Sequence, residues 1–146
     1  MTQQKTTELR DIATLMTVPV FTCKSNEPLN RAAQLMWEHD VGAVPVVDDD
    51  GRIVGILTDR DVAMAAYTRG RSLLEIDAAT AMSSTTITCR SSDTIGYAEH
   101  LMREKQIRRL PVVDSKQRPV GFLSLSDIAR EVDHVPGEHA GDRDVV

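Results

Sequence analysis

The hydrophobic pattern of the chain predicts helices and strands in one order that occurs twice. In the first copy, apolar residues at i, i+3, i+4 and i+7 predict a helix with one buried face that ends near His39. Two short β-branched runs follow, and Asp50-Gly51 between them predicts a hairpin, because glycine tolerates the positive φ of a tight turn. A second helix, with Tyr67 on its apolar face, is expected to stop at Gly70. The elements of this copy are expected at 18–23 (strand), 28–39 (helix), 43–47 and 52–57 (strands) and 59–70 (helix).

The second copy repeats this order at an offset of 66 residues. Its hairpin, Asp114 to Gln117, has no glycine and is therefore expected to use another type of turn. Its helices are expected at 76–82, 93–105 and 126–132, and its strands at 85–89, 110–113 and 119–124. The identical pairs that hold the register include Asp11/Asp77, Met16/Met82, Cys23/Cys89, Pro45/Pro111, Gly55/Gly121 and Asp61/Asp127.

This duplication predicts an α+β fold in which two similar β-α-β-β-α subdomains pack around a pseudo-twofold axis. The hairpin strands should be antiparallel, and the strand that a helix joins to them should lie parallel to its neighbour. A unit of about 60 residues is marginal by itself, so the two are expected to depend on each other. We expect a flexible segment at 1–9, the two repeats at 10–70 and 71–133, and a flexible tail at 134–146.

Charge and hydropathy narrow the classes of function. The formal net charge is -5 and the pI is about 5.3, so the basic surface typical of a duplex-binding protein is missing. The N-terminus lacks the apolar core of a signal peptide, and no apolar run is long enough to span a membrane. We therefore expect a cytoplasmic protein.

The residue pattern gives little support for catalysis or metal binding. Cys23 and Cys89 occupy equivalent strand positions without a CxxC motif, so buried reduced thiols are expected, and a disulfide between them is the alternative. The aspartates Asp48 to Asp50 suit a solvated turn better than a metal site, because no further ligands are spaced around them. No nucleophile motif or phosphate loop is present, so we expect no enzyme activity and no metal. Four histidines form no ligand set: His39, His100, His134 and His139.

A hydroxyl followed three residues later by an aspartate closes each copy, as Thr58 with Asp61 and as Ser124 with Asp127. One interpretation is a helix capping box, in which these groups satisfy the first N–H donors of a helix. The other is a ligand site, because a carboxylate can accept both hydrogens of a sugar diol and a helix N-terminus favours phosphate. The same side chain can serve both purposes.

Together with the strands Val44-Pro45-Val46-Val47-Asp48 and Leu110-Pro111-Val112-Val113-Asp114, these motifs resemble the cystathionine-β-synthase-type (CBS) domain, which occurs in tandem as a Bateman module. The resemblance implies an adenosine-containing ligand in the clefts between the repeats: AMP, ADP or ATP, or S-adenosylmethionine or NAD. The motif aspartates would hold the ribose, and adenine would lie against residues 17–20 and 83–87 and beside the proline strands. The residues that the resemblance assigns to the ligand are Thr17, Val18, Pro19, Val20, Val44, Pro45, Thr58, Asp61, Ser84, Thr85, Thr86, Leu110, Pro111, Ser124 and Asp127.

The two copies differ just before the second proline strand, where Arg108 and Arg109 replace Gly42 and Ala43. Two guanidiniums could pair with phosphate oxygens, or they could form a solvated basic helix end. We expect unequal sites, of which the phosphate-rich one depends on Arg108 or Arg109. The sequence leaves open which motif these arginines serve.

The family resemblance thus implies a regulatory module that senses AMP, ADP or ATP, requires no cofactor and signals to a separate effector protein. It also implies a homodimer through the helices, with neither nucleic acid nor membrane as a partner. The helix positions expected to leave surface for this dimer are Leu29, Val62, Ala66, Ile95, Ile128 and Val132. A ligand-free structural or interaction dimer, and a module for S-adenosylmethionine or NAD, are the alternatives.

Overall fold

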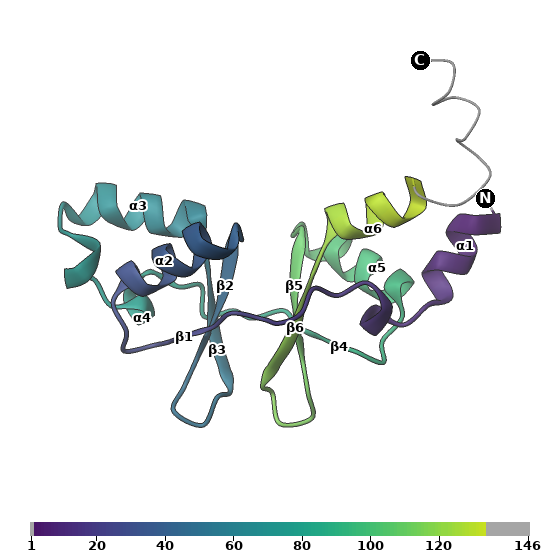
Figure 1. Cartoon of the computed structure of the whole chain (residues 1–146), viewed down its shortest axis with the longest axis horizontal. Coiled ribbons are helices and arrows are strands. Elements are labelled where there is room, and N and C mark those ends of the chain that lie inside the picture. Colours follow the sequence, from purple (N-terminus) through teal and green to yellow (C-terminus); the bar gives the residue numbers. More distant parts are fainter. Residues whose placement is uncertain (1, 134–146) are drawn as a thin grey trace, which may run out of the picture. The chain divides into compact units, whose positions relative to one another are not determined.

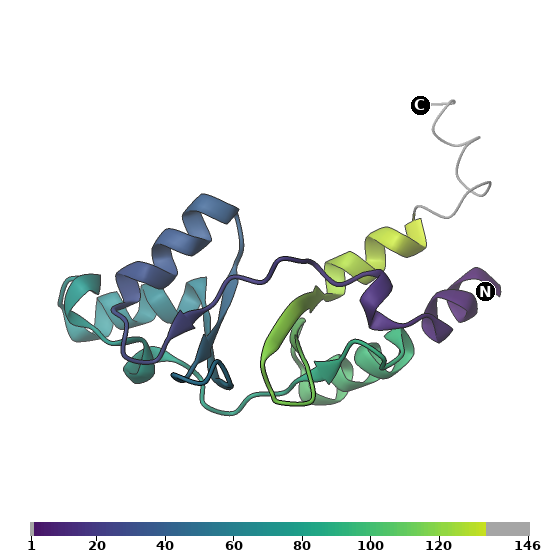
Figure 2. The same ribbon diagram turned by 60° about the horizontal axis from the view of Figure 1, so that its bottom comes forward.

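The structure is a computed structural model of the chain, and it describes residues 2–133 (Figures 1 and 2). The α-helices are α1 (Thr2–Leu9), α2 (Leu29–His39), α3 (Asp59–Arg69), α4 (Ala78–Ala81), α5 (Ile95–Lys105) and α6 (Leu125–Asp133). Two 3-10 turns are η1 (Ile12–Thr14) and η2 (Leu73–Glu75). The strands are β1 (Cys23–Lys24), β2 (Ala43–Val47), β3 (Ile53–Thr58), β4 (Cys89–Arg90), β5 (Arg109–Val113) and β6 (Pro119–Ser124). The expected tail at 134–146 lies outside the described residues.

The described residues form two compact units whose boundaries differ from those of the sequence repeats. Unit 1 comprises residues 2–18, 88–113 and 121–133, and unit 2 comprises 19–87 and 114–120. The segments that precede each repeat, residues 10–18 and 76–84, are called the lead-ins below. Each lead-in belongs to the unit that holds the other repeat's strands and helices. The boundaries of the sequence repeats therefore do not coincide with those of the compact units.

Unit 2 contains a three-stranded mixed sheet in the order β1-β2-β3. β1 pairs in parallel with β2, placing Cys23 opposite Val46, and β2 pairs antiparallel with β3, placing Ala43 opposite Thr58. Helices α2 and α3 lie side by side and pack against this sheet (Figure 1). Both strand directions and the α+β class agree with the sequence prediction. The core of this unit is small and aliphatic: Cys23, Leu29, Ala32, Leu35, Val44, Val46, Leu57, Ala65, Ile76 and Ala78.

Unit 1 contains the equivalent sheet in the order β4-β5-β6, with Cys89 of β4 parallel to and opposite Val112 of β5. Helix α1 packs against α5 and α6 of the same unit, and an ion pair joins Arg10 to Glu131. The N-terminal segment therefore differs from the expected flexible stretch: it is helical because a neighbouring helical surface is present for it to pack on. None of the helices within residues 2–133 has the length and apolar character needed to cross a membrane.

Two local predictions were wrong. The first strand of each repeat is only two residues long, whereas strands at 18–23 and 85–89 were expected; Pro19 has no N–H to donate, and parallel pairing with β2 begins only at Cys23. The buried face of α3 also differs, because Ala65 is buried whereas Tyr67 is 82% exposed. Alanines on several sides of one helix leave the direction of its buried face poorly specified.

The hairpin prediction was correct in the first repeat and wrong in the second. Gly51 has φ 82°, as an Asp-Gly turn requires. Gln117 has the same role in the second hairpin with φ 64°, so both turns are of one kind. In each hairpin the side chain of the first aspartate accepts two backbone N–H groups. Asp48 accepts from Asp50 and Arg52, both at 2.9 Å. Asp114 accepts from Lys116 at 2.8 Å and from Arg118 at 3.0 Å. This aspartate, rather than the glycine, is the shared determinant of the turn.

Candidate functional site

In unit 2 the Thr58 and Asp61 motif lies where β3 ends and α3 begins. The Asp61 N–H donates to Thr58 Oγ1 at 3.2 Å, and the Thr58 N–H donates to Asp61 Oδ2 at 2.9 Å. A complete capping box is thus present, which is one of the two interpretations that the sequence allowed. Within residues 2–133, no donor is recorded to the second oxygen, Asp61 Oδ1. A half-buried carboxylate with one oxygen in use retains acceptor capacity for a ligand hydroxyl.

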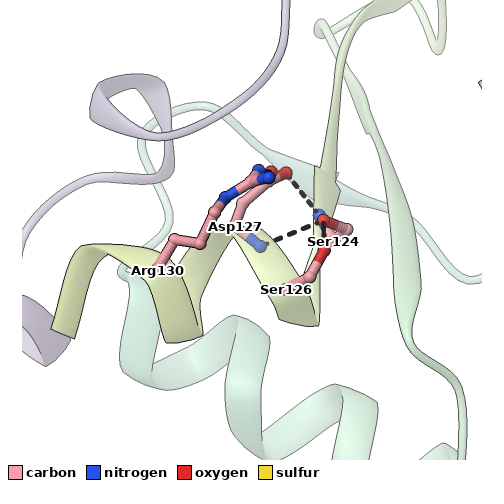
Figure 3. Close-up of polar contacts among 4 residues, drawn as sticks. All are labelled: Ser124, Ser126, Asp127 and Arg130. Carbon is pink, nitrogen blue, oxygen red and sulfur yellow. Dashed lines mark hydrogen bonds and ion pairs between the residues drawn. The ribbon is translucent and has the colours of Figure 1, made fainter. Parts of the chain in front are cut away.

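In unit 1 the equivalent motif joins β6 to α6 and has additional partners (Figure 3). The Asp127 N–H donates to Ser124 Oγ at 3.1 Å, and the Ser124 N–H donates to Asp127 Oδ2 at 3.0 Å. Ser126 Oγ lies 2.9 Å from Ser124 Oγ, and Arg130 forms an ion pair with Asp127 Oδ1. Both oxygens of this carboxylate therefore have a partner. Arg130 was not predicted from the sequence, although its spacing of three residues from Asp127 on one helix face could have indicated the pair.

The backbone of the predicted arginines lies beside the second motif. The Leu125 N–H, at the start of α6, donates to the Arg108 carbonyl oxygen at 2.8 Å, just as Asp59 donates to Gly42 at 3.0 Å in unit 2. Both Arg108 and Arg109 have exposed side chains at the beginning of β5. The backbone thus holds the base of this arginine pair beside the Ser124 and Asp127 motif.

The lead-ins lie against the strands that carry the motifs. Thr17 exchanges two backbone hydrogen bonds with Phe122 of β6, at 2.7 and 3.1 Å, in unit 1. In unit 2, Ser83 exchanges two with Ile56 of β3, both 3.0 Å. Thr17 and Ser83 therefore each lie opposite a strand residue that is two positions before a motif hydroxyl. Because both bridges are antiparallel, the residues that follow Thr17 and Ser83 run back along the strand, away from that hydroxyl. Of the residues predicted here, Thr17 and Val18 belong to unit 1, whereas Pro19, Val20, Ser84, Thr85 and Thr86 belong to unit 2.

The proline strands have a different role from the lead-ins. Val44, Pro45, Leu110 and Pro111 all have buried side chains. Pro45 pairs with Ile56, two residues before Thr58, so it supports the strand that carries the motif. These four residues form core, so burial gives no support for a direct contact between their side chains and a ligand.

A shallow pocket that the sequence did not indicate lies between α3 and α4 in unit 2. Its volume is about 200 Å³, and Arg69 at its wall donates to the Thr80 carbonyl oxygen at 3.3 Å. Small-molecule sites usually have volumes of about 300–1,000 Å³, so this pocket is too small for a whole nucleotide. Its lining is Asp61, Met64, Ala65, Thr68, Arg69, Thr80 and Ala81.

The cysteines and histidines offer no catalytic arrangement in the described part of the chain. Burial raises the pKa of Cys23 to about 11 and that of Cys89 to about 12, with nearby Glu27 and Asp93 adding to the respective shifts. Both cysteines are free and buried, as expected, and a neutral thiol is a poor nucleophile. His39 stacks on Phe21 with ring centroids 3.6 Å apart. Within residues 2–133, no three His, Cys, Asp or Glu side chains are grouped so that they could hold a metal ion; His134 and His139 lie outside this range.

Comparison with known proteins identifies both halves of the chain. The family model of the CBS domain matches residues 9–67 and again residues 76–134. The chain is 38% identical to the CBS domain-containing protein YhcV of Bacillus subtilis over 126 residues, covering 86% of each protein. It is also 38% identical to hypoxic response protein 1 of Mycobacterium tuberculosis, covering 92% of this chain and 88% of that protein.

Solved structures agree with this assignment. A crystal structure of hypoxic response protein I with two coordinated zinc ions superposes with a TM-score of 0.74 at 33% identity, covering 87% of this chain and all of that chain. A CBS domain pair in complex with 5′-methylthioadenosine and S-adenosyl-L-methionine superposes with a TM-score of 0.73 at 29% identity, covering 84% and 94% of the two chains. A putative signal-transduction protein from Burkholderia ambifaria gives 0.76 at 27% identity, covering 88% and 98%. With two family matches in tandem and a sheet-and-helix body for each, the chain belongs to the CBS-domain family and is a CBS domain pair.

Proposed function

We propose that this CBS pair binds an adenine nucleotide, AMP before ADP or ATP, at its two hydroxyl-and-aspartate motifs. The observation that supports it most directly is the duplicated, half-buried carboxylate at a helix N-terminus, beside a backbone segment from a lead-in. Carboxylates bind sugar diols through charge-assisted hydrogen bonds, which are about twice as strong as neutral ones. The exposed Arg108 and Arg109 add positive charge for phosphate in unit 1. Because the related pair was crystallised with two adenosyl compounds, S-adenosylmethionine or NAD is the second candidate.

The role that we propose is regulatory rather than catalytic. A bound nucleotide would change the affinity of the module for a separate effector protein by favouring one of two conformations of the module. The size of this change cannot exceed the difference in the affinity of the nucleotide for the two conformations. The cytoplasm is the proposed location, because two free cysteines suit a reducing compartment. No cofactor is required for this role.

We also propose that the module forms a homodimer through its helices. Leu29, Ile95 and Ile128 are buried in the cores, so the expected surface positions are wrong for half of the set. Trp37 on α2 is 88% exposed and Tyr67 on the adjacent α3 is 82% exposed, and such aromatic residues are enriched at protein interfaces. Trp37→Arg, which introduces the residue that the second repeat carries at Arg103, should shift the dimer to monomer in sedimentation velocity. A monomeric wild-type protein would contradict the dimer.

The ligand proposal is tested by calorimetric titration of the whole chain with AMP, ADP, ATP, S-adenosylmethionine and NAD. Asp61→Asn and Asp127→Asn retain an oxygen for the cap but lose the charge, so each should weaken binding at its own motif by about tenfold or more. Asp59→Asn is the matched control, since this exposed carboxylate lies in the same helical turn and caps only the Arg60 N–H. Absence of binding for all five compounds would favour the ligand-free structural dimer. Binding as tight as that of the wild type in both motif variants would contradict a role of the aspartates in the site.

A further inference from the structure

The two motifs differ in how far their aspartate is already occupied. Asp127 accepts from the Ser124 N–H through Oδ2 and from Arg130 through Oδ1, so its carboxylate is engaged on both oxygens (Figure 3). Asp61 has the first of these bonds but not the second. The residue equivalent to Arg130 at the offset of 66 is Met64, which has no charge and lines the pocket beside Asp61.

Charge around the motifs differs in the same direction. Six matched positions of each repeat, at the start of the helix and at the start of the strand bonded to it, are compared: 42, 43, 59, 60, 61 and 64 in the first repeat, and 108, 109, 125, 126, 127 and 130 in the second. The second set carries three arginines and one aspartate, a net charge of +2, whereas the first carries two aspartates and one arginine, a net charge of -1. The backbone bond from Leu125 to Arg108 holds the start of the arginine pair at the first turn of α6.

The ion pair between Arg130 and Asp127 is weak enough to be exchanged for a ligand. The Arg130 side chain is 67% exposed and the Asp127 side chain is 15% exposed. The guanidinium is mostly exposed and screened by water although the carboxylate is not, and we expect its displacement to cost less than about fivefold in affinity. A sugar hydroxyl that takes Oδ1 must either share this oxygen with the guanidinium or release it. Once released, the guanidinium has five N–H donors available within one helical turn of the sugar.

We propose that Arg130 is a specificity-determining residue that makes the Asp127 motif selective for phosphorylated nucleosides. This inference rests on the proposed ribose role of Asp127. An uncharged nucleoside that displaces Arg130 offers the guanidinium no compensating partner. A nucleotide supplies a phosphate that can bind the released guanidinium in bidentate fashion, with Arg108 close by. The Asp61 motif, with Met64 in place of the arginine, accepts uncharged adenosyl compounds without this penalty.

The test measures ligand binding at the Asp127 motif in the full chain, which carries Asp61→Asn to weaken binding at the other motif. Dissociation constants for adenosine and for AMP are measured by calorimetry with and without Arg130→Met, the residue of the other repeat. Arg130→Met should strengthen adenosine binding by about twofold to fivefold and weaken AMP binding by about fivefold to tenfold. The preference for AMP over adenosine should therefore fall at least about tenfold, and the salt dependence of AMP binding should decrease. Arg130→Lys, which keeps the charge without the planar fork, should lie between the two.

The reciprocal exchange provides an independent arm. In a chain carrying Asp127→Asn, Met64→Arg should create a preference for AMP over adenosine at the Asp61 motif. An AMP preference that stays within twofold after Arg130→Met, with binding intact, would overturn the role of Arg130 and leave the nucleotide proposal standing. Binding in the wild type that is lost entirely in Asp61→Asn, and not restored by Arg130→Met, would also overturn it. Absence of adenosine and AMP binding in every variant would overturn both proposals.

Discussion

Ile56 and Ser83 donate backbone hydrogen bonds to each other, both 3.0 Å long, which attach the second lead-in to strand β3 of unit 2. The glycine that precedes Ile56 makes this close approach possible. A Cβ on Gly55 would overlap with Met82 Sδ and would lie 2.9 Å from the Ser83 carbonyl oxygen. The lead-in therefore lies directly over a strand position that has no side chain.

The first prediction is that Gly55→Ala destabilises the protein more than Gly121→Ala. At Gly121 an added Cβ would lie 2.8 Å from Met16 Sδ and 3.3 Å from the Thr17 carbonyl oxygen, so a side-chain movement can relieve most of the contact. Overpacking of this kind costs about 1–3 kcal/mol. We expect Gly55→Ala near the upper end of that range and Gly121→Ala near the lower end, measured by urea unfolding.

The double variant Gly55→Ala/Met82→Ala separates side chain from backbone. It removes the thioether contact but leaves the Ser83 oxygen in place, so it should remain less stable than Met82→Ala alone. Equal stability of these two variants would contradict a backbone clash at Gly55.

A second prediction concerns the turn in which Gln117 has φ 64°. A side chain in the left-handed region costs about 1–2 kcal/mol, part of which glycine returns as unfolded-chain entropy. Gln117→Gly should therefore raise the free energy of unfolding by roughly 0.5–1 kcal/mol. Gly51→Gln is the matched reverse exchange in the first hairpin and should lower it. A loss of stability in Gln117→Gly would show that the glutamine side chain contributes more than its backbone conformation costs.

Third, both thiols should resist alkylation in the folded protein. With burial raising the pKa of Cys23 to about 11, about one thiol in a thousand is ionised near pH 8, and for Cys89 at about 12 the fraction is smaller. Iodoacetamide should therefore label neither residue until urea unfolds the chain, as followed by intact mass. In Cys23→Ser the labelling of Cys89 is measured by itself, and in Cys89→Ser that of Cys23. Rapid labelling of the native protein at either position would contradict its burial.

Fourth, stability should depend on pH through Glu99. Burial on α5, together with the negative charge of Glu8, raises the pKa of Glu99 above its usual 4.5, against the opposing effect of Arg103. The folded protein then binds this proton more tightly than the unfolded chain, so the stabilisation is complete below about pH 4.5 and is lost as pH rises through the raised value.

Glu99→Gln removes this dependence. Relative to the wild type it should gain stability between about pH 4.5 and 7, by less than about 1 kcal/mol because the side chain is only half-buried. Urea unfolding at a series of pH values measures the difference. Glu8→Gln should produce part of the same change, and a difference that does not vary with pH would contradict the assignment.

The sequence predicted the elements whose signals are local. Helix α2 ends at His39 as expected, β2 and β6 have the predicted limits, and Thr58 caps α3. Those features depend on periodicity, turn residues and capping groups within a few positions of each other. The prediction of a different turn type at Gln117 was wrong, because the aspartate that starts the turn, and not the glycine, determines its type.

What the sequence could not give depends on partners distant in the chain. A duplication at a constant offset is the same whether each lead-in packs on its own repeat or on the other, so the bonds of Thr17 to Phe122 and of Ser83 to Ile56 were not predictable. Arg130 was missed because a pair three residues apart on an exposed helix is common, and only its contact with a motif carboxylate distinguishes it. The residues assigned to the ligand, apart from their location in the fold, remain predictions.

The distribution of the lead-ins has a consequence for how such a protein can arise. A gene encoding only residues 10–70 would produce a body without the stretch that covers Gly55, while its own first residues would have no strand to join. Two copies of that gene product could complete each other's strands by exchanging their lead-ins. The tandem is thus expected to fold more stably than either repeat produced alone.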